Sequence, residues 1–141
     1  EKTAVVLDVS ACYAEMGGQV GDRGELKHGS QLWRIVDTQK SGHTWLHFLD
    51  RAVKSESGES DAPVPGLDVV VAGEARRRAA VQRHHTVTHL LHWALHEAVS
   101  REASQKGSFV GPDKLTFDFN CAPLTPQQVA DVDKLVNERI L

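Results

Sequence analysis

The spacing of apolar residues changes its period near residue 75, and this change restricts the chain to a fold with two different halves. Before it, "TAVVLDVSACYA", "QLWRIVDTQ" and "HTWLHFL" alternate with a period near two, as strands do, and Gly/Asp turns separate them. "LDVVVA" is one more expected strand, after a polar Pro/Gly loop at residues 55–66. Several short strands with close turns indicate a meander or a partly closed barrel over residues 1–75.

Beyond that point the apolar residues recur at helical spacing, which predicts a helix over residues 74–100. A Gly/Pro/Asp turn then separates two further expected strands, the second at residues 114–120. Thr125, Pro126 and Gln128 stand in the order of a helix cap and predict a last helix. Because this helix has no stop signal before residue 141, we expect the sequence to be a piece of a longer protein. The fold class predicted is α+β, with subdomains at residues 1–75 and 76–141.

The composition shows to which broad classes of protein this sequence can belong. Hydrophobic residues make up 40% and charged residues 25%, which suits a globular domain. No apolar run approaches the roughly 20 residues that span a bilayer, and no leader-like segment opens the chain, so we expect no membrane partner and a cytoplasmic location. Cys12 and Cys121 are far apart and form no CxxC pair, so both are expected to be buried apolar residues.

The net charge of −3 is unevenly divided along the chain. Residues 1–75 carry 7 basic and 12 acidic groups, whereas residues 76–141 carry 9 basic and 7 acidic groups. This basic excess permits an anionic partner such as RNA. A solvated helix start is the simpler explanation of the arginine run at residues 76–78.

Four histidines, at positions 85, 89, 92 and 96, share one face of the predicted helix. At about 100° per residue they fall within an arc of roughly 60°, nearly opposite the apolar face. His85 and His89 are about 6 Å apart along the axis, so their ring nitrogens can converge on one ion, although zinc needs at least one more ligand. The alternative, a polar face exposed to solvent, is favoured by spacing alone. Thr86 follows His85 where a zincin protease needs Glu.

Three blocks occur in a fixed order along the chain: "CYAEMGGQVGDRGEL" at 12–26, "HTVTHLLHWAL" at 85–95 and "SQKGSFVGPDKLTFDFN" at 104–120. Together they resemble the editing domain of alanyl-tRNA synthetase, which is related to free-standing alanyl-tRNA editing proteins and to the editing domain of threonyl-tRNA synthetase. The resemblance covers nearly the whole chain. It implies a small β-barrel-like subdomain followed by an α+β editing core with a long HxxxH helix.

The resemblance also implies roles for single residues. His85 and His89 are similar to metal ligands, and Thr88 is similar to a pocket residue that bears on amino-acid selectivity. Gln105 is similar to a polar active-site residue, so Thr88 and Gln105 are expected to be catalytic and to bind substrate. Lys106 is a candidate for phosphate contacts, together with the arginines at 76–78. For Thr88 the alternative is a helix-interior threonine bonded to its own backbone.

Two other sets of residues, a second histidine pair and a Gly-Gly-Gln segment, are expected to have structural roles. His92 and His96 do not belong to the ligand pair and are expected to lie on the exposed helix face. The "GGQ" at residues 17–19 is also found in peptide release factors, which hydrolyse an ester on tRNA. In the family resembled here it is expected to be a shaping loop rather than to supply a catalytic Gln19.

The resemblance implies a zinc site that this sequence cannot complete. In the family the other two ligands, a Cys and a His, lie beyond the last helix, and this sequence does not contain them. Cys121 precedes that helix and does not match the missing motif. We therefore expect Zn²⁺ in the intact protein and weak binding or none in this chain.

The function implied is hydrolysis of the ester that joins a wrong amino acid to tRNA. A pocket fitted to alanine cannot strongly reject glycine or serine, so a second sieve that deacylates Ser-tRNA(Ala) and Gly-tRNA(Ala) is useful. The expected partners are the acceptor end of tRNA(Ala) and the rest of an alanine-tRNA ligase, and the isolated piece need not be active. Two alternatives stay open: a free-standing editing protein, and a non-catalytic RNA-binding module of the same fold.

Overall fold

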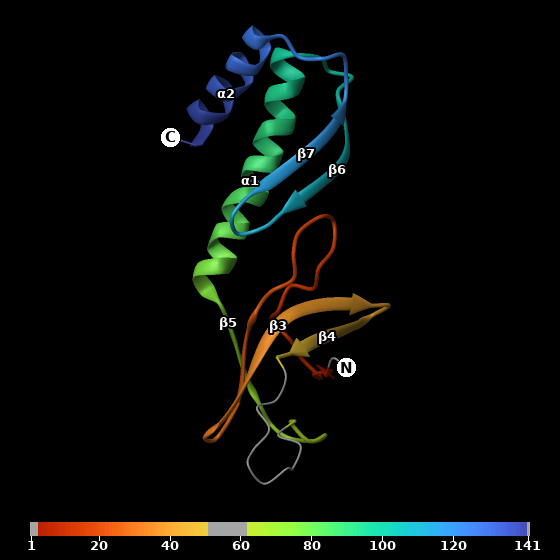
Figure 1. Ribbon diagram of the computed structural model, residues 1–141, viewed down its shortest axis with the longest axis vertical. Coiled ribbons are helices and arrows are strands. Elements are labelled where there is room, and N and C mark those ends of the chain that lie inside the picture. The colour runs from red at the N-terminus through yellow and green to blue at the C-terminus, as the bar shows by residue number, and fades with distance from the viewer. Residues whose placement is uncertain (1–2, 51–61, 141) are drawn as a thin grey trace. The chain divides into compact units, whose positions relative to one another are not determined.

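The structure, a computed structural model, describes residues 3–50 and 62–140, so most of the loop expected at 55–66 lies outside the described residues. The chain divides into two compact units. Unit 1 comprises residues 1–16 and 20–78, and unit 2 comprises residues 17–19 and 79–141 (Figure 1). Both helices and strands are present, which confirms the α+β class.

Unit 1 contains one antiparallel sheet with the strand order β1-β4-β3-β2-β5. The strands are β1 (Ala4–Val5), β2 (Gly24–His28), β3 (Gln31–Ser41), β4 (Thr44–Leu49) and β5 (Val70–Gly73). Within residues 3–50 and 62–140 the edge strands β1 and β5 do not pair with each other. The sheet is open, and the barrel-like expectation is not confirmed. Edge strands of two and four residues offer few backbone groups with which a barrel could close.

A β-bulge in β3 sets which side chains reach the core of unit 1. Trp33 and Ile35 are buried two residues apart, as a strand pattern predicts. The register shifts between Ile35 and Asp37, so Thr38 takes the next buried position instead of Asp37. The buried cluster of this unit is Cys12, Leu26, Trp33, Ile35 and Leu49.

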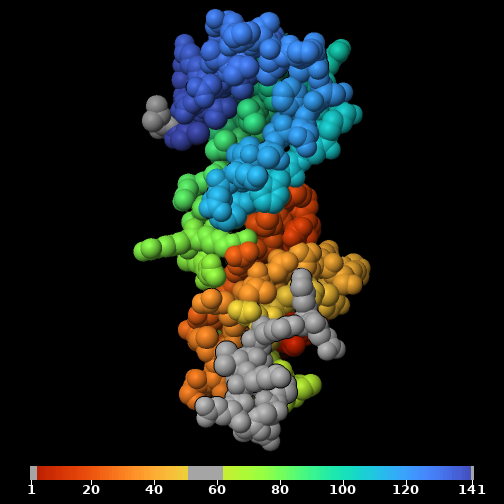
Figure 2. Space-filling model, viewed as in Figure 1, coloured from red at the N-terminus to blue at the C-terminus, as the bar shows by residue number. Residues whose placement is uncertain are grey.

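Unit 2 consists of two helices and a hairpin. Its elements are α1 (Ala75–Ala98), whose first turn belongs to unit 1, β6 (Ser104–Val110), β7 (Leu115–Asn120) and α2 (Pro126–Ile140). Ala94 and Leu95 of α1 pack against Val132 of α2, and Phe117 and Phe119 of β7 join this core. In the space-filling view the hairpin and α2 cover much of α1 on the face shown (Figure 2). β7 alternates half-buried and exposed residues, as the sequence pattern predicts.

Both predicted helices are confirmed, and their ends follow from local hydrogen bonds. The N–H of Gln128 donates to Thr125 Oγ1 (3.2 Å), and Gln128 Oε1 accepts from the N–H of Thr125 (2.9 Å), which is the reciprocal cap expected. The carbonyl of Glu74 accepts from the N–H of Arg78 in the first bond of the helix, so Glu74 is the N-cap residue of α1. No helix in the described ranges is long and apolar enough to cross a membrane.

The two cysteines differ, although the sequence predicts burial for both. Cys12 is buried in the core of unit 1, as expected, and burial raises the pKa of its thiol. Cys121 is exposed, so the prediction for it is wrong. It follows directly after β7, in the bend between the hairpin and α2, and its Sγ donates to the carbonyl of Ala122 (3.0 Å).

Candidate functional site

The helix α1 brings His85 and His89 together on one exposed face of unit 2. The two Nε2 atoms are 3.1 Å apart, and the ring centroids are 5.0 Å apart with the planes tilted by 52°. A spacing of four residues places both side chains on the same helix face, one turn apart. The two Nε2 atoms therefore lie close together, the convergence that the helical spacing predicts.

The loop of residues 17–19, here called the Gly-rich loop, reaches this pair from a distant part of the sequence. Gln19 Oε1 lies 2.8 Å from Nδ1 of His85. Gln19 itself forms a parallel bridge with Val110 at the end of β6, and the N–H of Val110 donates to the carbonyl of Gly18 (2.8 Å). The sequence predicts that these residues form a shaping loop, but it does not predict this contact. Sequence periodicity cannot find it, because it joins residues 66 positions apart.

Gly18 permits the close approach of this loop to β6. Its φ is +83°, in the left-handed region that favours glycine. A Cβ at this position would lie 2.3 Å from the carbonyl oxygen of Ser108. A side chain at position 18 would thus displace the backbone that carries Gln19 to His85.

Thr88 lies on the same helix but is buried, with only 8% of its surface exposed. Its Oγ1 donates to the carbonyl of His84 one turn earlier (2.8 Å), the backbone bond considered as the alternative. The hydroxyl proton is therefore used, and the oxygen keeps only acceptor capacity. His84, which the sequence interpretation did not single out, donates from Nδ1 to the carbonyl of Gly111 (2.7 Å) and joins α1 to the end of the hairpin.

Gln105 and Lys106 are exposed on β6, at the other end of the strand from Val110. The strand runs back along α1, because His96 donates to the carbonyl of Ala103 before β6 (2.6 Å) and His84 bonds to Gly111 after it (Figure 1). Five residues of strand separate Gln105 from Val110, or about 16 Å. No hydrogen bond in the described part of the chain joins Gln105 or Lys106 to the histidine pair.

His92 and His96 do not lie on an exposed face, contrary to the prediction. Both are half-buried, and their ring centroids are 4.4 Å apart. The ring of His92 packs against Phe117 at 5.5 Å, and its Nε2 is buried with no hydrogen-bond partner among the described residues. The hairpin covers this part of the helix face, so the four-histidine stripe separates into an exposed pair and a packed pair.

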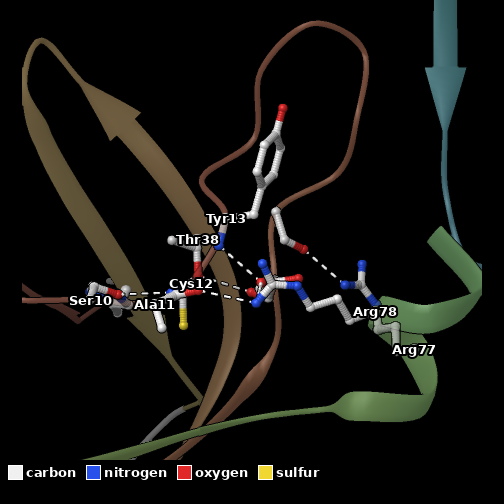
Figure 3. Close-up of polar contacts among 10 residues, drawn as sticks. Ser10, Ala11, Cys12, Tyr13, Thr38, Arg77 and Arg78 are labelled. Atoms are coloured by element: carbon white, nitrogen blue, oxygen red, sulfur yellow. Dashed lines mark hydrogen bonds and ion pairs between the residues drawn. The ribbon is translucent and has the colours of Figure 1, made fainter. Parts of the chain in front are cut away.

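Two arginines expected to be available for phosphate are engaged within unit 1 (Figure 3). Arg77 Nη1 donates to the carbonyl of Gly21 (2.9 Å), and burial lowers the pKa of its guanidinium. Arg78 Nη1 donates to the carbonyl of Ala11 (3.1 Å) and lies 3.3 Å from Oδ2 of the buried Asp22. These side chains bind the segment of residues 11–22 in unit 1, and a role in phosphate binding stays a prediction.

The histidine pair fits zinc as two of its ligands. With Nε2 atoms 3.1 Å apart, both can lie at the usual distance of about 2.0–2.1 Å from one ion. No group of three or more His, Cys, Asp or Glu residues that could hold a metal occurs in the ranges that the structure describes. By itself the pair would supply two of the four ligands that a tetrahedral zinc site needs.

Comparison with known proteins places these features in a family. Residues 1–61 match the family described as tRNA synthetases class II (A). An alanine–tRNA ligase of Aromatoleum aromaticum is 45% identical over 143 residues, which cover 97% of this chain and 15% of that protein. Those of Dichelobacter nodosus and Methylacidiphilum infernorum are 42% and 40% identical, over 100% and 96% of this chain.

The alignments extend over the segment that forms α1 as well as over residues 12–26, because they cover 96–100% of the chain. The chain spans only 14–16% of the length of these relatives. It therefore belongs to the alanine–tRNA ligase family and corresponds to one segment of those proteins.

Proposed function

We propose that this segment is the editing part of an alanine–tRNA ligase and hydrolyses the ester of Ser-tRNA(Ala) and Gly-tRNA(Ala). The observation that carries the proposal is the exposed pair of His85 and His89 within unit 2, in which Gln19 contacts His85. Membership of the family supports a tRNA substrate. The need for editing follows from the weak discrimination that an alanine pocket has against glycine and serine.

In this proposal the pair holds a Zn²⁺ ion whose remaining ligands come from outside the described residues. When bound, the ion supplies Lewis-acid chemistry, either orienting the ester or activating the attacking water. Thr88 contributes an acceptor, because its proton is committed to His84. A hydroxyl oxygen with free lone pairs suits the α-ammonium of the substrate or the hydroxyl of a seryl group.

Gln105 and Lys106 act at the nucleotide end of the substrate. They lie toward the far end of β6 from the histidine pair, and both are exposed. Only a substrate long enough to span that separation contacts both places. An amide suits hydrogen bonds to ribose and an ammonium suits phosphate, so the acceptor end of tRNA(Ala) is the proposed partner here. The rest of the ligase chain is the other proposed partner.

A deacylation assay tests the proposal. The Aromatoleum aromaticum ligase is prepared with this sequence in place of its homologous segment, and serine release from Ser-tRNA(Ala) is followed. We expect deacylation, and a loss of about a hundredfold or more on His85→Ala or His89→Ala. His43→Ala, an exposed histidine of unit 1, is the matched control. Charging of tRNA with alanine shows that the rest of each chimeric ligase is folded, and circular dichroism of the 141-residue chain with the same substitution shows that the segment itself is folded.

The same assay addresses the second candidate function, a non-catalytic RNA-binding module. Two observations favour that candidate: the ligand set is incomplete in the described residues, and the Thr88 hydroxyl bonds to its own helix. A chimera that charges tRNA but never releases serine would refute editing and leave the binding module. Unchanged deacylation in the His85→Ala chimera would refute the role of the pair.

A further inference from the structure

We infer that Gln19 is a positioning residue. It fixes the tautomer of His85, with the proton on Nδ1, so that the lone pair of Nε2 faces His89. The relevance of this to hydrolysis rests on the proposed function, but the hydrogen-bond arrangement stands on the contacts alone. Four atoms form the arrangement: Gln19 Oε1 lies 2.8 Å from His85 Nδ1, and Nε2 of His85 lies 3.1 Å from Nε2 of His89.

The direction of each bond follows from the chemistry of the groups. An amide oxygen accepts and cannot donate, so the proton between Gln19 and His85 belongs to Nδ1. A neutral imidazole carries one N–H, so Nε2 of His85 is then a bare acceptor. The contact to His89 therefore has the Nε2–H of His89 as its donor. The resulting chain runs from His89 through His85 to Gln19, and every contact in it has one donor and one acceptor.

The backbone of unit 2 holds the side-chain oxygen of Gln19 close to His85. Gln19 bridges Val110, and the carbonyl of the preceding Gly18 accepts from the N–H of Val110. Gly18 packs against the backbone of Ser108 so closely that no Cβ would fit. The same end of β6 is fixed to α1 by the bond from His84 to Gly111. The loop and the helix are thus both fastened to the end of β6, and their separation is set by the fold.

This arrangement leaves one nitrogen, Nε2 of His85, ready to bind an ion. A histidine that binds a metal through Nε2 usually donates its Nδ1–H to a carbonyl or carboxylate, which fixes the ring and raises the basicity of the ligand. Gln19 supplies that acceptor for His85. His89 lacks such a partner among the hydrogen bonds of the described residues, so it must move its proton from Nε2 before it can bind an ion through that nitrogen.

Side-chain NMR of the ¹⁵N-labelled, metal-free 141-residue chain tests the inference. The ¹⁵N shifts of Nδ1 and Nε2 report which nitrogen of each imidazole carries a proton. We expect Nδ1–H for His85 and Nε2–H for His89. Gln19→Leu removes the acceptor and should move His85 toward the Nε2–H form, whereas Gln19→Glu retains an acceptor and should restore Nδ1–H. Gln82→Leu, an exposed amide one turn before His85, should change neither ring.

Titration with Zn²⁺ alone, followed on the same resonances, provides the second readout. Loss of a partner of a metal-binding histidine typically weakens metal affinity by 10–100-fold. We expect a weakening of about that size for Gln19→Leu, recovery for Gln19→Glu and no change for Gln82→Leu.

Two results would overturn the inference. One is an Nε2–H on His85 in the unsubstituted chain, which would mean that the Gln19 amide presents its nitrogen. The other is a His85 tautomer that stays the same in Gln19→Leu while the amide spectrum remains that of a folded protein. If instead the tautomer responds as expected but the chimera releases no serine, the positioning role stands and the proposed function fails.

Discussion

The fit of the Gly-rich loop against β6 can be tested at two adjacent glycines. Gly17 and Gly18 both have positive φ, at +60° and +83°. They differ in their surroundings, because a Cβ at Gly17 meets nothing within 4 Å, whereas one at Gly18 lies 2.3 Å from the carbonyl oxygen of Ser108. Gly17→Ala and Gly18→Ala thus share the backbone strain, and only the second adds a clash with backbone atoms.

The expected costs can be worked from these contacts. Left-handed backbone costs an alanine roughly 1–2 kcal/mol. The lower entropy of the unfolded alanine chain offsets about 0.4–1 kcal/mol of this. Gly17→Ala should therefore lower the free energy of unfolding by about 0–1.5 kcal/mol. Gly18→Ala must also break the bond from Val110 to the Gly18 carbonyl, which contributes about 0.5–1.5 kcal/mol, and must shift the loop. We expect a total of about 2–4 kcal/mol.

Urea unfolding gives the two free energies, and amide hydrogen exchange at Val110 gives the local effect. In Gly18→Ala the Val110 amide should lose its protection even if the rest of unit 2 stays folded, because the acceptor moves away. In Gly17→Ala that protection should persist. Equal costs for the two variants, or a Val110 amide that stays protected in Gly18→Ala, would refute the reasoning.

Three further predictions concern the two cysteines and the cap residue Thr125. Alkylation at about pH 8 should label the exposed Cys121 about a hundredfold faster than the buried Cys12, and equal rates in peptide mass spectrometry would contradict the burial of Cys12. Thr125→Ala should lower the free energy of unfolding in urea by about 1 kcal/mol through loss of the α2 cap, with Thr125→Ser as a control that keeps the hydroxyl. Because burial raises the pKa of Cys12, the unfolded chain loses this proton first, so stability should fall as pH rises above the ordinary value of 9.0. Cys12→Ala should lack this part of the decline, and identical pH profiles would count against it.

Much of the fold could be predicted because its signals are local. The cap at Thr125 and Gln128 specifies the start of α2 within a few residues of sequence. Strand alternation likewise identifies Trp33 and Ile35 as core residues. The bulge after Ile35 could not be predicted, because it depends on how β3 pairs with β4. Closure of the sheet is also a question of pairing between distant strands, and there the barrel-like expectation is not confirmed.

The candidate site also has a part that could be predicted from the sequence and a part that could not. The approach of His85 and His89 follows from helix geometry and could be predicted from their spacing. The different surroundings of His92 could not, because Phe117 comes from β7 and covers the helix only in the folded unit. The contact of Gln19 with His85 likewise depends on a loop that joins β6 far from its place in sequence. Spacing along one helix shows which residues can act together, but not which of them the rest of the chain covers.

The central claim is that the exposed pair, and not the histidine stripe as a whole, carries the hydrolysis of mischarged tRNA. The most direct measurement compares single-turnover serine release from Ser-tRNA(Ala) by the chimeric ligase carrying His85→Ala with release by the one carrying His92→Ala. The account predicts a loss of about a hundredfold or more for His85→Ala. It predicts a change of only a few-fold for His92→Ala in protein that still charges tRNA, because His92 packs against Phe117. Equal losses in the two variants, or none in His85→Ala, would contradict it.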